Sequence, residues 1–434
     1  MRALKVALLL GISTCALGQE AIEWRPPVHS GWYPMPLFLT NSNLEVRTEA
    51  YAGFVSSHVV YRDLIKPSDS IEGTYDLTVS SAINKINNKN YLNASFRASP
   101  LALMWKYKSG LQFNLALTYN AYLQSYVSRD LLEVLWYGNA PYRGKSKKLD
   151  ASINFMNFYS LSMGLTWKFP NVPLLTFGFS ASLIMPNQVI YTLYNEGEIF
   201  TSLYIDTLRV RLNYQILQSK NSGFSPRGLA FSGGITYQPI TELFFYAYLY
   251  NIGFVNLNEQ STLLKISSNS TYTGTSLSNI TIKSLLYDTL NLDAVADSIR
   301  QLISIDTIKP QKPRVPTPST LAVGLSYQID NATHFWTDIQ LLKWRWYELS
   351  ASFGLTRKVK NWLIASLFYA YKFRYPYNLG VSAQIKILPN LEVRIASDNI
   401  LGTIAPKFAH STHLFLGIRY MHKSQSYTFG LPKF

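Results

Sequence analysis

The sequence lacks the residues on which several protein classes depend. Among 434 residues there is one cysteine, Cys15, and charged side chains make up only 15%. Beyond residue 17, no apolar run reaches the eighteen or so residues of a membrane-spanning helix. Because Cys15 lies in the N-terminal leader, we expect a mature chain without disulfides, a cysteine nucleophile or a cysteine metal site.

The N-terminus has the features of a secretory signal. Arg2 and Lys5 precede an apolar run, Val6 to Leu17, and Ala16-Leu17-Gly18 offers small residues for cleavage before Gln19. The run is too short to span a bilayer. We therefore expect a signal peptide at 1–18, export, and an N-terminal extension at 19–43.

Acidic residues are few. The 40 basic and 25 acidic residues give a net charge of +15, which falls to +13 when Arg2 and Lys5 leave with the signal. Such a balance often indicates nucleic-acid binding, but this chain is predicted to be exported and its basic residues are dispersed. Outer-membrane lipid and lipopolysaccharide are the expected partners, and nucleic acid is not.

What the chain has in abundance is alternation. From Leu208 to Ile216, apolar residues alternate with Arg209, Arg211, Asn213 and Gln215. Successive side chains of a strand point to opposite faces, so such a segment has one apolar face and one polar face. The pattern recurs about fifteen times without a compensating set of helices. In an exported protein this predicts an all-β, transmembrane antiparallel β-barrel over 44–434 in the outer membrane.

The strand number follows from the segments. Single-chain bacterial barrels usually have an even number of strands. Either 44–60 lies outside the wall, which gives fourteen, or 200–217 turns near Asp206, which gives sixteen. We favour about fourteen, within 13–16. The segments are 44–60, 91–107, 111–120, 152–168, 177–183, 208–216, 227–238, 243–255, 321–328, 334–344, 346–357, 362–373, 379–386, 391–399 and 412–422.

The polar face is rich in Gly, Ser, Thr, Asn and Gln, which suits a lumen partly filled by side chains. Arginines on this face are few, and we predict that Arg209 and Arg211 line the lumen. An equal alternative is that the basic residues of the strands pair with carboxylates or face headgroups. Aromatic pairs near strand ends, such as Trp105 with Tyr107 and Trp344 with Trp346, are typical of interfacial girdles.

The stretch 256–319 breaks the alternation. A Ser/Thr/Asn-rich part is followed by a segment around 292–303 whose apolar residues share one helical face. Four prolines between 310 and 318 predict a stiff, extended exit. We expect a helical and Pro-rich insertion that plugs, caps or docks.

Motifs for chemistry are weak. Gly138 to Ser146 has five residues between its glycines where a phosphate loop needs four, so we expect a polar surface loop. Ser397-Asp398-Asn399 has no partner motifs of a penicillin-binding enzyme. The six histidines lack the spacing of a helical metal site, although Ser411 with His413 leaves a remote hydrolase alternative. We expect no enzyme activity, cofactor or metal.

Two segments carry a resemblance. The helix and proline-bearing exit into Leu321–Gln328, and Ala396 to Gly402 with Asp398, Asn399 and Gly402, resemble an uncharacterised family of Bacteroidota outer-membrane barrels. The resemblance implies the architecture of PorV and of the long-chain fatty-acid transporter barrels. Related barrels often carry Asn-Pro-Ala near the mature N-terminus, where this chain has Tyr33 to Pro36.

These observations give two functional hypotheses. The first is passage or binding of a hydrophobic or amphipathic small molecule, gated inside the barrel. The alternative is a non-transporting scaffold that holds a secretion or surface-assembly partner at 256–319. The terminal Phe434, with Tyr427 and Phe429 keeping the period of two, predicts recognition by the barrel-insertion machinery.

Overall fold

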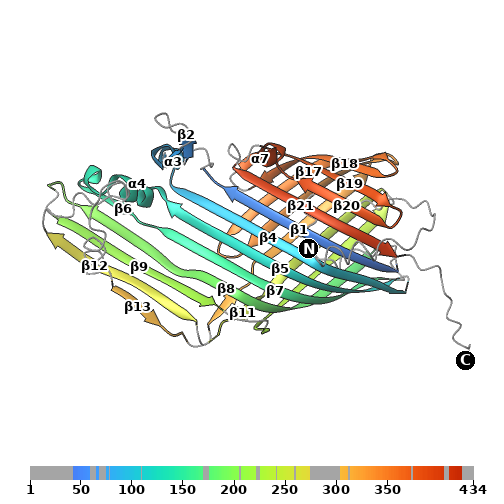
Figure 1. The fold of residues 1–434 in the computed structure, drawn as a ribbon, viewed down its shortest axis with the longest axis horizontal. Helices are drawn as coiled ribbons and strands as arrows, with labels where there is room; N and C mark the ends of the chain where they lie inside the picture. The colour runs from blue at the N-terminus through green and yellow to red at the C-terminus, as the bar shows by residue number, and fades with distance from the viewer. Residues whose placement is uncertain are drawn as a thin grey trace, which may run out of the picture.

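The computed structural model describes residues 43–58, 65–67, 75–77, 79–108, 110–169, 175–204, 207–220, 225–240, 242–258, 261–273, 304–310, 313–372, 375–404 and 410–422. Its main feature is a barrel of long antiparallel strands (Figure 1). Fourteen strands form the closed wall, in the following order: β1 (Leu44–Ser56), β4 (Lys89–Lys108), β5 (Leu111–Ser128), β7 (Ala151–Lys168), β8 (Leu175–Thr201), β10 (Gly228–Ile240), β11 (Leu243–Asn256), β15 (Ser319–Gln328), β16 (Thr333–Lys343), β17 (Tyr347–Lys360), β18 (Leu363–Lys372), β19 (Tyr375–Leu388), β20 (Leu391–Ser397) and β21 (Ser411–His422).

The wall closes between its first and last strands. Each of the fourteen strands pairs antiparallel with the next. Leu44 at the start of β1 lies opposite His422 of β21 and opposite Trp105 of β4. Because the wall closes, each of its fourteen strands is paired on both sides. A barrel in hydrocarbon needs this pairing, since lipid cannot bond the backbone groups of an open edge. The predicted fold class and the strand number of fourteen are confirmed.

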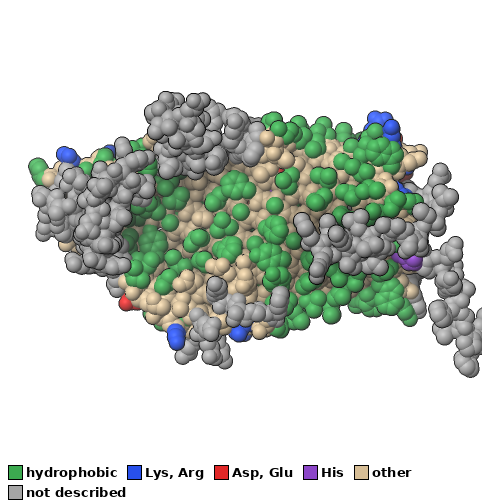
Figure 2. Space-filling model, viewed as in Figure 1, with side chains coloured by type: hydrophobic (Ala, Val, Ile, Leu, Met, Phe, Trp, Pro, Cys, Tyr) green, Lys and Arg blue, Asp and Glu red, His purple; other side chains and the backbone are tan. Residues whose placement is uncertain are grey.

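The alternation of the sequence becomes an inner and an outer face. On β5, Phe113, Leu115 and Leu117 are exposed on the outside, while Gln112 and Asn114 are buried inside. The inner polar groups satisfy one another: Gln112 Nε2 donates to Asn114 Oδ1 at 2.7 Å, and Asn114 Nδ2 donates to Thr166 Oγ1 at 3.1 Å. Apolar side chains cover much of the visible outer face, and charged side chains lie toward its borders (Figure 2).

The two ends of the barrel differ. At the end where β1 begins, the connections are short, as between β4 and β5 or between β10 and β11. The opposite end carries the longer ones, with β2 (Ile65–Pro67), β3 (Tyr75–Leu77), α3 (Val79–Lys85), α4 (Arg129–Tyr137), η2 (Ala140–Tyr142), β6 (Lys145–Lys148) and α7 (Ile400–Ile404). We call these the short-turn end and the long-loop end. No helix of the described residues is long and apolar enough to cross a membrane.

The strand count is right for a reason different from the predicted one. The segment 44–60 supplies β1, which is part of the wall. The segment that lies outside the closed ring is instead β9 (Thr207–Lys220), because β8 forks. The first part of β8 pairs with β10, whereas its last part, from Gln188 to Thr201, pairs with β9. The sequence could not distinguish these cases, since β9 alternates as cleanly as a barrel strand.

The insertion at 256–319 begins and ends at the long-loop end. Although the sequence there shows no strand alternation, the insertion contains strands: β12 (Thr262–Thr273) pairs with β9, and β13 (Ser304–Ile308) pairs with β12. β14 (Arg314–Pro316) pairs with β11, in agreement with the predicted extended exit. Cross-strand pairing to β9 gives the Ser/Thr/Asn-rich segment a strand conformation that its composition did not indicate. The predicted helix around 292–303 lies outside the described residues.

Aromatic side chains mark the short-turn end. Trp105, Tyr107 and Trp167 are about half exposed on the outer face, as expected of an interfacial girdle. Trp344 was predicted to belong to such a girdle but is only 5% exposed and packs in a core cluster inside the barrel.

Candidate functional site

The connection between β16 and β17, residues 344–346, crosses the lumen. Trp346 lies against Tyr91 of β4 and Tyr126 of β5, with ring centroids 5.5 and 5.7 Å apart. β4 and β5 are not neighbours of β16 or β17 in the wall. These contacts therefore span the interior. We call residues 344–346 the inward turn.

Polar contacts fix the inward turn to the opposite wall. The backbone N–H of Arg345 donates to Gln124 Oε1 at 3.1 Å, and the amide nitrogen of Gln124 donates to the carboxylate of Glu348. The guanidinium of Arg345 donates to the carbonyl of Leu193 on β8 at 3.1 Å. The inward turn thus bridges the lumen from β16 and β17 to β5 and β8.

Apolar packing supports the same bridge. Trp344 belongs to a cluster of buried residues that includes Tyr122, Phe158, Val189 and Leu257. Its indole N–H donates to the carbonyl of Pro316 at 3.0 Å, which satisfies the one polar group of the ring. A buried aromatic residue of this size contributes a few kcal/mol to packing, roughly 3–5 by truncation to alanine in other cores.

A cavity of about 90 Å³ lies inside the barrel next to the inward turn. Its lining combines aromatic rings from opposite walls, Tyr51, Tyr122 and Trp344, with the polar side chains of Gln340 and Lys372. All five side chains are more than nine-tenths buried. A concave space with apolar walls and a few polar groups is the usual form of a small-molecule site.

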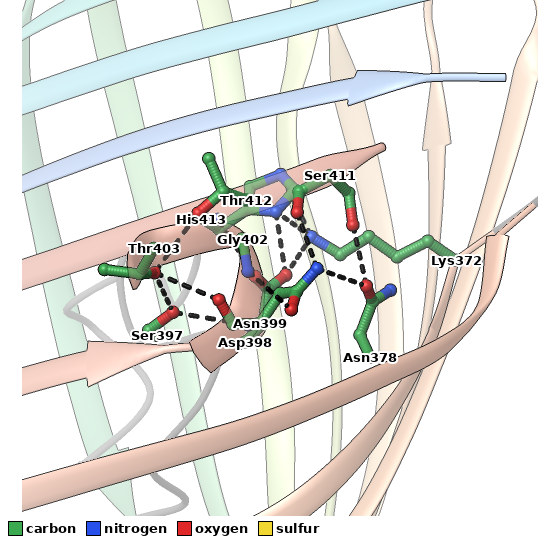
Figure 3. Close-up of polar contacts among 10 residues, drawn as sticks. All are labelled: Lys372, Asn378, Ser397, Asp398, Asn399, Gly402, Thr403, Ser411, Thr412 and His413. Carbon is green, nitrogen blue, oxygen red and sulfur yellow. Dashed lines mark hydrogen bonds and ion pairs between the residues drawn. The ribbon is translucent and has the colours of Figure 1, made fainter. Parts of the chain in front are cut away.

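A buried ionic cluster borders this cavity (Figure 3). Lys372 of β18 and His413 of β21 both line the cavity, and both contact the carboxylate of Asp398. His413 Nδ1 lies 2.7 Å from Asp398 Oδ2, and the backbone N–H of His413 donates to Asp398 Oδ1 at 2.9 Å. The ring of Tyr51 stacks on His413 at 5.5 Å. Sequence reasoning missed Lys372, because one lysine at the end of a strand carries no signal.

The charge state of Asp398 follows from these neighbours. Burial alone would raise the pKa of its carboxyl, but the adjacent His413 and Lys372 outweigh burial and hold the pKa well below its ordinary value. Asp398 therefore stays ionised and balances the charge of Lys372.

The segment that carried the family resemblance holds this cluster in place. Asn399 Nδ2 donates to the carbonyl of Ser411 at 2.7 Å and to Asn378 Oδ1 at 3.0 Å, while the backbone N–H of Gly402 donates to Asn399 Oδ1 at 2.9 Å. Asn399 thereby ties α7 to β19 and β21 (Figure 3). Asp398, Asn399 and Gly402 are brought together as an internal support.

The remaining candidates lie elsewhere. Arg209 and Arg211 are exposed on β9, opposite Phe200 and Glu198 of β8, and β9 is not one of the fourteen strands of the closed ring. Phe434 lies outside the described residues. The hydroxyl of Ser411 donates to Asn378 Oδ1 at 2.8 Å, where a hydrolase would need it on a histidine. The described residues contain no group of three or more His, Cys, Asp and Glu side chains that could hold a metal ion.

Comparison with known proteins gives one family. The model of a family of unknown function, DUF5723, matches residues 43–398. The chain matches none of the curated proteins.

Solved structures show similar barrels. The chain is 12% identical to the TodX deltaS2S3 mutant monoaromatic hydrocarbon channel, with a TM-score of 0.45 and coverage of 88% of this chain and 90% of that one. For the P. putida toluene transporter TodX the values are 10%, 0.42, 89% and 91%. For a Pseudomonas aeruginosa FadL homologue they are 9%, 0.41, 88% and 90%.

Proposed function

Because the chain belongs to DUF5723, a family of unknown function, we propose a function from its own geometry: it is an outer-membrane barrel that binds and passes a hydrophobic or amphipathic small molecule. The observation that carries the proposal is the cavity beside the inward turn, with aromatic rings on opposite walls and polar groups between them. Such a lining accepts an apolar body and orients it by one polar group.

The inward turn is the proposed gate. Passage along the lumen requires that residues 344–346 leave the opposite wall. Its direct polar contacts there are few, namely those of Arg345 and of Glu348 with Gln124 and Leu193. A short turn held by a few hydrogen bonds and by aromatic packing is the kind of element that opens locally.

The orientation follows from the loops. Outer-membrane barrels have short periplasmic turns and longer extracellular loops. We therefore place the long-loop end, with the insertion, outside the cell. Lipid and lipopolysaccharide would surround the apolar outer face, and the signal peptide at 1–18 would direct export. The scaffold alternative depended on a docking helix at 256–319, and no feature of the described strands there favours it.

The test is a reversible closure of the gate. Tyr126→Cys with Trp346→Cys places a thiol on each side of the contact, and Cys15 is the only other cysteine. Cross-linking the pair with a short bis-methanethiosulfonate reagent in proteoliposomes should abolish uptake of the hydrophobic probe N-phenylnaphthylamine, and reductant should restore it. The two single-cysteine variants, treated identically, are the controls.

The proposal fails on two outcomes. Uptake that is unaffected by cross-linking would exclude the inward turn as the gate. No uptake above protein-free liposomes, under any condition, would exclude passage itself.

A further inference from the structure

The cavity holds polar atoms that the described residues leave without a hydrogen bond. They are the amide nitrogen of Gln340, the hydroxyl of Thr320 and the side-chain oxygen of Asn93. All three residues line the cavity. Gln340 is 5% exposed and Thr320 is 2% exposed. Buried polar groups are nearly always paired in native proteins, so unpaired ones around one space call for an occupant.

The three atoms come from opposite walls. Thr320 and Gln340 lie on the neighbouring strands β15 and β16, whereas Asn93 lies on β4 across the barrel. Gln340 supplies a donor, Asn93 an acceptor, and Thr320 either. An occupant that satisfies them must both donate and accept hydrogen bonds.

The charges around the cavity do not favour an ion. Lys372 lines the cavity, but Asp398 already neutralises it, and the carboxylate of Glu348 lines the same space. A carboxylate ligand would face Glu348 without an unpaired cation to offset the repulsion. An ammonium ligand would have no acceptor for the amide nitrogen of Gln340.

The size of the cavity suits a small molecule. A volume of about 90 Å³ is several times the roughly 10–15 Å³ that one water molecule needs. The rings of Tyr122 and Trp344 offer flat apolar contacts to the body of a small molecule.

We propose that the cavity is a binding site for a small uncharged molecule with a hydroxyl group, whose hydroxyl pairs with Gln340 and Thr320 on neighbouring strands and whose apolar body lies against Tyr122 and Trp344. This deepens the proposed function, on which it rests, by naming the ligand class.

The test compares three probes of similar shape: phenol, benzoate and benzene. Binding to the purified barrel in detergent is measured by ligand-observed NMR, with empty micelles as the blank. We expect phenol to bind more tightly than benzene and benzoate not to bind. Gln340→Met and Thr320→Val each remove a polar atom at similar volume. Each should weaken the binding of phenol about fivefold and leave the binding of benzene unchanged.

A matched control and a structure complete the design. Gln112→Met makes the same change at a buried lumen residue outside the cavity, whose amide is bonded to Asn114, and should leave phenol binding as in the wild type. Equal binding of phenol and benzene, tight binding of benzoate, or a high-resolution structure with phenol present that shows ordered water only in the cavity would overturn the inference. Those outcomes leave uptake of N-phenylnaphthylamine intact, whereas loss of that uptake would overturn the proposed function.

Discussion

The side-chain amide of Gln124 donates a hydrogen bond to the carboxylate of Glu348, which lies 224 positions later in the chain and on the far side of the barrel. The same amide accepts from the backbone of Arg345. One glutamine on β5 thus holds both the inward turn and the first residues of β17. The contact joins β5 to β17, so that side chains bridge the lumen at this level of the barrel.

Removing the largest side chain of the bridge should open the lumen. Trp346→Ala deletes the contacts with Tyr91 and Tyr126 and leaves a passage where the indole lay. We expect single-channel conductance in planar bilayers to rise from near zero to resolved openings. Trp362→Ala, at an exposed position of the short-turn end, is the control and should stay closed. A closed Trp346→Ala channel would show that other elements seal the barrel.

Substitutions in the ionic pair of Lys372 and Asp398 should have strongly non-additive effects on the free energy of unfolding. Lys372→Met leaves the buried carboxylate of Asp398 with less compensation, so we expect a loss of about 3 kcal/mol in the free energy of unfolding. Adding Asp398→Asn removes the uncompensated charge and should recover part of that loss. Urea unfolding in micelles, followed by the heat-modifiable gel shift of the barrel, measures both variants. A double variant less stable than Lys372→Met would contradict this account.

The long-loop end should loosen in acid. Glu133 of α4 contacts Lys147 of β6 and Arg129. Burial opposes its ionisation, but the two cations outweigh burial and lower the pKa of Glu133 below its ordinary value of 4.5. Since the folded pKa is the lower one, the stabilisation is complete above pH 4.5 and is lost as the pH falls through the lowered value.

Hydrogen exchange measures this effect. We expect exchange of the α4 amides to accelerate below pH 4.5 beyond the intrinsic pH dependence, and Glu133→Gln to remove that excess. Glu196→Gln changes an exposed carboxylate of β8 and should leave the excess in place. Equal profiles for the wild type and Glu133→Gln would refute the role of the carboxylate.

The fold was predictable because the alternation that specifies each strand is a local pattern in the sequence. Alternation along β5 or β15 determines which residues face outward, and the closed barrel follows from the repetition. The fork of β8 was not predictable, since pairing of β9 with β8 and β12 depends on contacts between distant segments. The inward position of Trp344 was equally hidden, because an aromatic residue at a strand end can face lipid or the lumen with the same local pattern.

The site was predictable only in fragments. Asp398 and Asn399 stood out through a resemblance, and His413 through its neighbour Ser411. Lys372 and Gln340 lie far from them in sequence and follow the ordinary polar period of β18 and β16. Only the closure of the barrel brings Gln340, Lys372 and His413 to one cavity, with Asp398 beside them on Lys372.

Ion selectivity tests which basic residues lie along the permeation path: Arg209 and Arg211, predicted from the sequence, or Lys372, which the structure places beside the cavity. In the Trp346→Ala background, Arg209→Ser with Arg211→Ser removes two positive charges from β9, which lies outside the closed ring. Because these arginines do not belong to the wall of the closed ring, reversal potentials under a KCl gradient should not change. Lys372→Met removes a charge inside the ring and should shift the potential toward cation selectivity, because Asp398 and Glu348 remain. A shift produced by the arginine pair instead would return Arg209 and Arg211 to the permeation path and place that path along the β8–β9 extension.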